Sequence, residues 1–298
     1  NGTQFAIVAS DSNTVVTITP SVATGGHPAG VPYNLVLQPG DAYQLRNTND
    51  APADLTGTLI KSDKPIAVFG SHRCANMPSE TEWFCDYLVE QMLPVNTWGN
   101  DFYTAPLATR SGGDTFSLLA AYDNTDTYLN GAFITTLNRG QSIRGPVAAG
   151  AHFTSSKPIM LTQFANSGDW DGNTNADPFM LTVQAVRHYA NSYRVCTPTN
   201  DFPTNYITVI AQSGIIGGTL VDGAPIAGPF LAIGATGYSY ARALVSPGAH
   251  IVTNPNGLFG CYVYGWAEYD SYGHPACFYF GDVLPPTINS TVGNTTAS

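Results

Sequence analysis

Charged side chains are scarce in this chain of 298 residues. Asp, Glu, Lys and Arg together make up 11% of it, against about 25% in an ordinary soluble domain. The lysines are Lys61, Lys64 and Lys157, and the 21 acidic residues outnumber the 11 basic ones. Binding to nucleic acid is excluded because a phosphate-backbone binder needs clustered Lys and Arg. Adhesion to anionic lipid is disfavoured for the same reason.

Long apolar runs are lacking as well. No run of 18 or more apolar residues occurs, so the sequence predicts no membrane insertion. A helix-rich protein is also disfavoured, because helical surfaces are usually built from Glu, Lys, Arg and Gln. The chain instead has 30 glycines, 21 prolines and 16 tyrosines, with 43% apolar residues overall. This composition is typical of many short strands joined by turns around a buried core.

The five cysteines contain no C-x-x-C spacing, which makes a zinc knuckle or a thioredoxin-like site improbable. Cys74 and Cys85 bracket a short loop and are predicted to form a disulfide, the alternative being two buried thiols. Cys261 and Cys277 flank an aromatic segment and are the second predicted pair. Cys196 is then left over, either buried or bridging to another chain.

Glycosylation sequons occur only near the two ends of the chain, at Asn1, Asn289 and Asn294. The last residues, 287–298, are polar and rich in Thr and Asn, as in a linker or stalk. These features predict an extracellular or cell-surface glycoprotein whose chain begins after removal of a signal peptide.

The sequence is similar to itself. Phe5–Thr14 aligns without gaps to Phe116–Thr125, and Ile207–Ala211 is a weaker third copy. Ser62–Phe69 matches Ser155–Thr162 near the end of each unit. Self-similarity at a fixed period indicates a repeat architecture.

A third block links the units. Asp86–Val95 lies 91 residues before Asp177–Val186, and the same offset relates Phe102 to Tyr193. The repeat favours a strand over a capped helix at 87–93, because the second copy carries Pro178 and β-branched residues there. The sequence therefore predicts an all-β fold of three related β-sandwich-like modules, each of about 95 residues, packed into one compact unit. Their expected bounds are 1–85, 86–176 and 177–284, followed by a linker or tail at 285–298.

Several segments taken together resemble the IgGFc-binding protein N-terminal domain family over roughly residues 3–280. They are Lys64–Val68, Cys74–Pro78, Cys85–Gln91, Trp98-Gly99, Ala108–Thr115, Asp177–Met180, Thr204–Tyr206, Tyr262–Gly265 and Ser271–Pro275. The resemblance implies a non-catalytic binding or structural domain of a large secreted or surface protein, associated with mucus and adhesion. It implies no catalytic residues, and its IgG-binding name describes one animal member. Cys277 stands where the family pattern expects a glycine-like turn, which suggests an extra disulfide.

One loop has the composition of a calcium site. Asp169, Asp171, Asn173, Asn175 and Asp177 alternate around a glycine, and Ca²⁺ takes six to eight oxygen ligands. The terminal Glu of an EF-hand is missing. The alternative is a polar turn rich in Asx caps.

Two further sets of residues are candidates for ligand binding. Arg110 and Asp114 flank a Ser-Gly-Gly turn and form either a ligand-contacting loop or a structural ion pair between units. Tyr262, Tyr264 and Trp266 alternate and so share one face of a strand. They form either a platform for sugars or proteins, or core between modules.

Catalysis is not predicted. His72 lies close to Cys74, but no G-x-S-x-G elbow accompanies it and a disulfide-bonded cysteine cannot attack. Acid pairs for glycoside hydrolysis occur in any carboxylate-rich loop. We therefore expect a non-enzymatic extracellular structural or adhesive domain of a larger surface or fibre-forming protein. Its expected partners are other copies of itself or other extracellular proteins. The alternative is a carbohydrate-binding module for mucin or cell-wall glycans, and a secreted hydrolase is the least favoured.

Overall fold

The computed structural model describes residues 2–47 and 53–280. The predicted sequons at Asn1, Asn289 and Asn294 and the predicted tail at 285–298 lie outside the described residues. In the described part, the regular elements are β-strands and four short 3-10 helices. The all-β prediction is confirmed. None of the helices described is long and apolar enough to cross a membrane.

The N-terminal segment forms two antiparallel sheets. Their strand orders are β4-β1-β6-β7 and β3-β2-β5. Alternate residues of β1 and β2 point inward, so Phe5, Ile7, Val16 and Ile18 meet in a core cluster of their own. The strands are β1 (Thr3–Ala9), β2 (Thr14–Thr19), β3 (Tyr33–Leu37), β4 (Ala42–Arg46), β5 (Leu59–Ser62), β6 (Ile66–Asn76) and β7 (Cys85–Gln91). The prediction of a strand rather than a helix at 87–93 is therefore confirmed for most of its length.

The middle segment is built around one long strand, β13 (Ala151–Phe164). The first half of β13 pairs with β8 and β10, and its second half pairs with β9 and β14. The sheet order is β11-β10-β13-β9-β12. The other elements are η1 (Val95–Thr97), β8 (Gly99–Thr104), β9 (Asp114–Ala120), β10 (Thr125–Leu129), β11 (Ala132–Leu137), β12 (Ser142–Val147), η2 (Gly168–Trp170) and β14 (Met180–Thr182).

The C-terminal segment again has two antiparallel sheets, ordered β15-β21-β17-β18 and β19-β20-β16-β22-β23. Its helices are η3 (Val186–His188) and η4 (Ile216–Gly218). Its strands are β15 (Ser192–Thr197), β16 (Thr204–Gln212), β17 (Leu220–Val221), β18 (Ala224–Pro225), β19 (Leu231–Ala232), β20 (Tyr238–Val245), β21 (Gly248–Thr253), β22 (Gly260–Ala267) and β23 (Asp270–Pro275).

The same strand pairing recurs in the three segments. The strands β1, β9 and β16 each lie between two antiparallel partners, which are β4 and β6, β12 and β13, and β20 and β22. The strands β2, β10 and β17 also each have two antiparallel partners, β3 and β5, β11 and β13, and β18 and β21. This recurrence supports the internal similarity, while the division into three modules of about 95 residues stays a prediction.

Repeated residues also make repeated contacts. Lys64 and Lys157 each donate from Nζ to a turn carbonyl, that of Ser12 or Asp123. The next residue in each turn, Asn13 or Asn124, has a positive φ of 53° or 54°, a conformation that asparagine tolerates better than most residues. Two of the three lysines thus hold the same turn in two segments.

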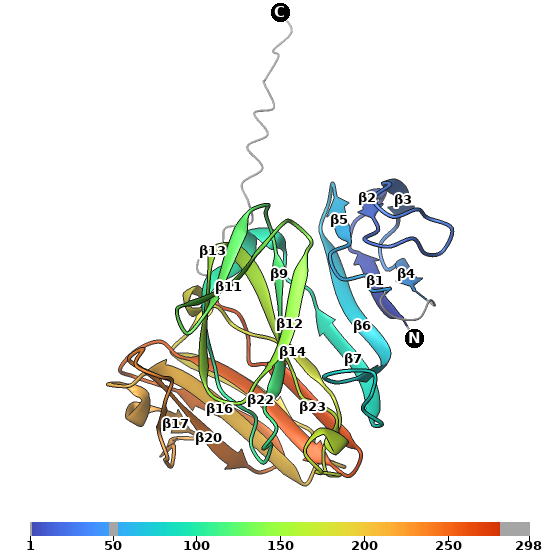
Figure 1. The fold of residues 1–298 in the computed structure, drawn as a ribbon. Coiled ribbons are helices and arrows are strands. Elements are labelled where there is room, and N and C mark those ends of the chain that lie inside the picture. Colours follow the sequence, from blue (N-terminus) through green and yellow to red (C-terminus); the bar gives the residue numbers. More distant parts are fainter. Residues whose placement is uncertain (1, 48–52, 281–298) are drawn as a thin grey trace, which may run out of the picture.

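The three segments pack against one another (Figure 1). The largest core cluster contains Phe116, Phe153 and Leu161 of the middle segment together with Tyr262, Tyr264 and Trp266 of β22. A small cluster of Ala75, Met77, Leu88 and Phe164, with Met180 packed against it, connects the N-terminal and middle segments. The ends of β6, β7 and β23 meet the loop between β13 and β14 at this edge of the molecule.

Candidate binding surface at the junction of the three segments

A disulfide joins the end of β6 to the start of β7. Cys74 and Cys85 are bonded, with their Cα atoms 5.0 Å apart, as the sequence predicts. The second predicted disulfide is not formed, and Cys196, Cys261 and Cys277 are free thiols. Ala276, and not Cys277, lies opposite Cys261, because the Ala276 N–H donates to the Cys261 carbonyl at 2.9 Å. Cys277 follows Ala276 beyond the end of β23 at Pro275, so strand pairing does not place its thiol opposite that of Cys261.

Arg110 forms an ion pair with a different carboxylate from the one expected. Its Nη2 lies 2.9 Å from Oδ1 of Asp171, and its Nε donates to Oδ2 at 3.0 Å. Nη2 also donates to the Ser167 carbonyl at 2.8 Å. The side chains of Arg110 and Asp171 are 0% and 3% exposed. The structural interpretation of Arg110 is therefore supported, but the predicted pairing with Asp114 is wrong.

Asp114 is instead buried at the start of β9. Its Oδ2 accepts hydrogen bonds from the Leu107 N–H at 2.8 Å and from Gln163 Nε2 at 2.9 Å. Burial raises the pKa of Asp114 to about 7, and the hydrogen bond from Leu107 is the largest opposing effect. Asp114 holds the 105–108 loop and is not available to an external ligand.

Three of the five predicted calcium ligands accept hydrogen bonds from donors of the protein itself. Asp169 accepts from the backbone N–H of Trp83 at 2.6 Å, and Asp171 is held by Arg110. Asn173 accepts from the backbone N–H of Asn175 at 3.1 Å, as in an Asx turn. In the described part of the chain, no three His, Cys, Asp or Glu side chains are grouped so that they could hold a metal ion. These contacts fit the polar-turn alternative, and calcium binding stays a prediction.

The aromatic side chains of β22 belong to the core. Tyr262, Tyr264 and Trp266 do share one face of the strand, but that face is buried against the middle segment. The Tyr262 hydroxyl donates to the Ala105 carbonyl at 2.9 Å, and the Tyr264 hydroxyl accepts from the Ala108 N–H at 2.9 Å. The interpretation as an exposed platform is wrong, and the alternative, a core between neighbouring segments, is confirmed.

Other aromatic side chains are exposed where the three segments meet. Trp83, beside the disulfide, is 85% exposed, and Tyr87 and Tyr269 are also exposed. The ring of Phe84 packs edge-on against Tyr269 with centroids 5.3 Å apart. We call Trp83, Phe84 and Tyr269, with the carboxylates of Asp86, Asp169, Asp177 and Asp270, the junction surface.

The junction surface is fixed by hydrogen bonds between segments. Asp169 of the middle segment accepts from the backbone of Trp83, and the Tyr269 N–H donates to the Thr174 carbonyl at 3.1 Å. The Ser271 hydroxyl donates to the Asp177 carbonyl at 2.5 Å. Each contact joins residues that are far apart in sequence, so the aromatic side chains extend from a preformed scaffold.

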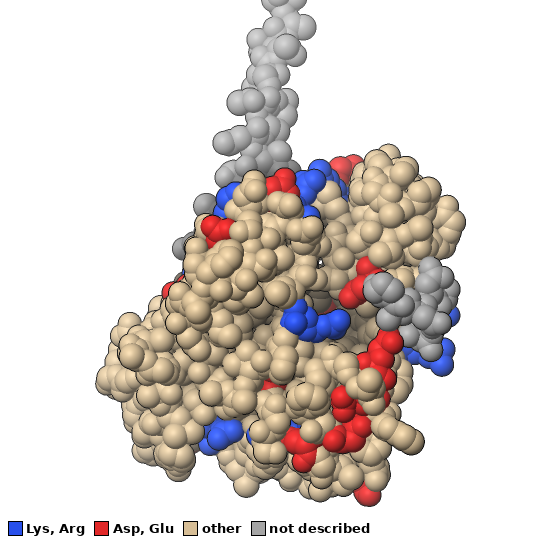
Figure 2. Space-filling view, viewed as in Figure 1, with Lys and Arg blue, Asp and Glu red and all other residues tan. Residues whose placement is uncertain are grey.

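The carboxylates of the junction surface act on one another. Burial is the largest cause that raises the pKa of Asp177 to about 6, and the charges of Asp86, Asp270 and Asp169 contribute to the same shift. Burial also raises the pKa of Asp86, with a contribution from Asp270. Figure 2 shows acidic side chains gathered in a band over this edge of the molecule. Mutual repulsion of this kind is relieved by an external positive charge.

The sequence contains a signal for this surface outside the recognised motifs. Trp83 and Phe84 lie between the acidic residues Glu82 and Asp86. In the sequence this segment could be recognised as a disulfide-closed loop, but its exposure depends on contacts with residues more than 80 positions away.

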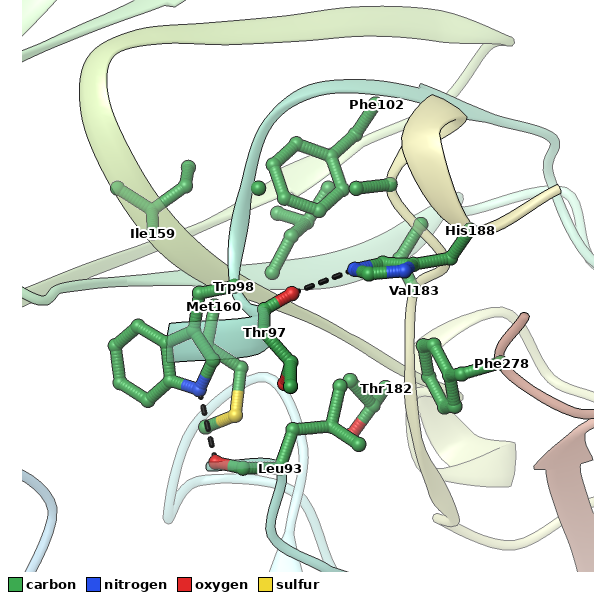
Figure 3. A pocket seen from close by; sticks show the side chains of 13 residues that line it. Leu93, Thr97, Trp98, Phe102, Ile159, Met160, Thr182, Val183, His188 and Phe278 are labelled. Carbon is green, nitrogen blue, oxygen red and sulfur yellow. Dashed lines mark hydrogen bonds between the residues drawn. The ribbon is translucent and has the colours of Figure 1, made fainter. Parts of the chain in front are cut away.

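Two hollows in the described part of the structure are each lined by a histidine. A cavity of about 10 Å³ lies among Trp98, Phe102, Ile159 and His188 (Figure 3), and it is no larger than one water molecule. His188 uses both ring nitrogens, on the carbonyls of Thr97 at 2.5 Å and of Tyr279 at 3.1 Å. A hollow of about 490 Å³ between β17 and β20 includes His250, whose nitrogens bond to Asp222 and to the Ser246 carbonyl. Neither histidine is free to act as a general base.

The model of a known family, described as "IgGFc binding protein", matches residues 1–265. The chain belongs to the IgGFc-binding protein family. This confirms the resemblance inferred from the motifs. Human IgGFc-binding protein is 26% identical over 252 residues, which cover 81% of this chain. The matched stretch is 4% of the length of that human relative.

Proposed function

We propose that this member of the IgGFc-binding family is a non-enzymatic extracellular domain of a larger surface or fibre-forming protein, with a structural or adhesive role. It is built from three related β-sandwich-like modules, and it binds another extracellular protein at the junction surface. The observation that carries the proposal is Trp83, an aromatic side chain that is 85% exposed on a disulfide-closed segment. Exposed aromatic side chains bury a large area on binding with little loss of conformational entropy.

The location outside the cell is supported by the disulfide. Bonds such as Cys74–Cys85 persist in oxidising compartments and are rare in the cytosol. The size of the human relative, of which the matched stretch is 4%, supports a role as one domain among many.

The name of the human relative provides the first partner to test. That protein is described as binding IgG Fc, and Fc is therefore a candidate partner of this chain. A second copy of the chain is the other protein candidate, since a structural or fibre-forming role requires self-association. A mucin glycan is the partner expected of the alternative, a carbohydrate-binding module, because tryptophan beside carboxylates also suits sugar rings.

The test measures binding of the wild-type chain to human IgG Fc, to a second copy of the chain and to an array of mucin glycans. Trp83→Ala is compared with Phe133→Ala, which removes another exposed aromatic ring, from β11 and away from the junction surface. Loss of a central aromatic contact lowers affinity by about tenfold or more, and we expect this only for Trp83→Ala.

Each result distinguishes the candidates. Binding to Fc or to the second copy that is lost on Trp83→Ala supports the proposal. Binding to glycans alone replaces it with the carbohydrate-binding alternative. Equal affinities of Trp83→Ala and wild type, or no binding to any member of the panel, overturns the role of the junction surface.

A further inference from the structure

We propose that the junction surface recognises a positively charged polypeptide segment, rich in Lys or Arg, on the partner protein. This inference rests on the proposed function and adds the chemistry of the partner. It is carried by charge complementarity, by a buried carboxylate oxygen without a partner, and by the aromatic rings beside the carboxylates.

The first step concerns charge. The carboxylates of Asp86, Asp169, Asp177 and Asp270 come from all three segments and lie close enough to influence one another. The cation that acts on Asp177 is Arg110, but Arg110 is itself paired with Asp171 and fully buried. The surface therefore keeps an excess of negative charge. A second copy of the chain, with a net charge of -10, would be repelled here.

The second step concerns Asp177. This residue is only 6% exposed, and its Oδ1 atom has no hydrogen-bond partner within the described part of the structure. A buried carboxylate oxygen without a donor is costly. Its carboxyl group lies within reach of the charges of Asp86, Asp169 and Asp270. An incoming guanidinium or ammonium group would supply the missing donor, and it would reduce the repulsion at the same time.

The third step separates a polypeptide from a single metal ion. In the residues that the structure describes, no three acidic side chains are grouped closely enough to hold a metal. The four carboxylates are therefore spread over the surface, and one small ion cannot contact them together. A chain that carries several separate cations can match such a spacing.

The fourth step concerns the aromatic rings. Trp83 is exposed on the segment that leads into Asp86, and Tyr269 is exposed next to Asp270; the faces of Trp and Tyr rings attract Lys and Arg side chains. The arginine guanidinium stacks on aromatic rings and pairs bidentately with carboxylates. The combination of rings and carboxylates in one place thus favours arginine over a generic cation.

The experiment uses fluorescein-labelled octa-arginine as the probe, with octa-glutamate as the negative control, on the complete chain. The test variant is Asp86→Asn with Asp270→Asn. Each of these carboxylates accepts from the N–H of the next residue through Oδ1, a bond that the asparagine oxygen can keep. The matched control is Asp11→Asn with Asp201→Asn, which removes two exposed charges elsewhere. Unchanged melting temperatures show that the variants fold.

We expect octa-arginine to bind the wild type and the matched control alike, and to bind the test variant at least about fivefold more weakly. Added salt should weaken the binding of the wild type. Equal weakening in the two double variants would show non-specific attraction to the net charge and overturn the inference. Equal affinity for the test variant and the wild type, or no binding at all, would overturn it as well.

Different results would overturn the cationic nature of the partner and the binding role of the junction surface. If a protein partner from the binding panel is lost on Trp83→Ala but keeps its affinity for Asp86→Asn with Asp270→Asn, the surface binds a partner that is not cationic. If Trp83→Ala leaves that partner bound, the proposed function itself is wrong, whatever octa-arginine does.

Discussion

The guanidinium of Arg110 and the carboxylate of Asp171 form a buried two-point contact across 61 positions of sequence, with nitrogen–oxygen distances of 2.9 and 3.0 Å. The same Asp171 Oδ2 accepts from the Ser111 N–H at 2.9 Å. The Arg110 guanidinium also lies 5.7 Å from the centroid of the Trp266 ring. One side chain thus connects the 165–179 loop, the turn before β9 and the core between the middle and C-terminal segments.

Removal of one partner of this pair should destabilise the protein strongly. Arg110→Ala leaves Asp171 buried without its counter-charge, which typically costs about 3–5 kcal/mol. Asp171→Ala likewise leaves the charge of Arg110 buried and unpaired. The double variant leaves neither charge, so its loss of stability should be smaller than the sum of the losses of the two single variants. The free energy of unfolding, measured in urea, checks this. A loss below about 1 kcal/mol, the usual value of an exposed pair, would contradict the assigned role.

The disulfide should stabilise the junction surface. Cys74 and Cys85 are 11 positions apart, and closing a loop of this length contributes about 2–3 kcal/mol by the chain-entropy model. We expect Cys74→Ala with Cys85→Ala to lower the melting temperature of the chain, and a reducing agent to do the same to the wild type.

The control for the disulfide is Cys196→Ser, which changes an exposed free thiol and should leave the melting temperature unchanged. A reducing agent should have no further effect on the double alanine variant. If it lowers the melting temperature of that variant by as much as in the wild type, another disulfide must be responsible.

The sequence predicted features that depend on local pattern and failed where contacts between distant segments decide the outcome. The alternation of Tyr262, Tyr264 and Trp266 revealed their shared face, because side chains on a strand alternate with a period of two. Whether that face meets solvent depends on the middle segment, which covers it. In the same way Asp114, four residues from Arg110, was the expected ion-pair partner of Arg110. Its place at the start of β9 instead brings its carboxylate to the Leu107 N–H.

The short segment around Trp83 shows the same limit. The spacing of Cys74 and Cys85 was enough to predict the loop, because the disulfide that closes it joins residues only 11 positions apart. The exposed position of the Trp83 ring follows from Asp169, 86 residues away, which holds the backbone of Trp83 and Phe84. No local pattern contains that information.

Tyr264 should contribute stability through its hydroxyl group as well as its ring. The hydroxyl accepts from the buried Ala108 N–H, and Tyr264→Phe leaves that donor without a partner. A buried unsatisfied donor costs about 1–3 kcal/mol. The matched control is Tyr206→Phe, because Tyr206 stacks on Tyr264 and is only half-buried. Urea unfolding should show a loss for Tyr264→Phe alone, and equal losses for the two variants would contradict the role of the hydrogen bond.

Buried carboxyl groups should make the protein less stable as the pH rises. Burial raises the pKa of Asp114 to about 7, from 3.8 for an exposed aspartate. Between these two values the folded protein binds a proton that the unfolded chain has released. The stabilisation from this proton is therefore present in full below about pH 4 and is lost as the pH rises through about 7. Glu90, whose pKa burial raises to about 7, and Asp177 at about 6 act in the same direction.

The measurement compares the free energy of unfolding at about pH 5 and about pH 8 in the wild type, in Asp114→Asn and in the exposed control Asp201→Asn. The wild type and the control should lose stability over this interval with the same slope. Asp114→Asn should lose less, because the amide carries no titrating proton while its oxygen can still accept from the Leu107 N–H. Asp222 does not obscure the comparison: the hydrogen bond from His250 lowers its pKa, so its contribution is lost only at a pH below the ordinary aspartate value. Equal slopes in all three proteins would show that Asp114 is ionised in the folded state throughout, and that the donors from Leu107 and Gln163 outweigh its burial.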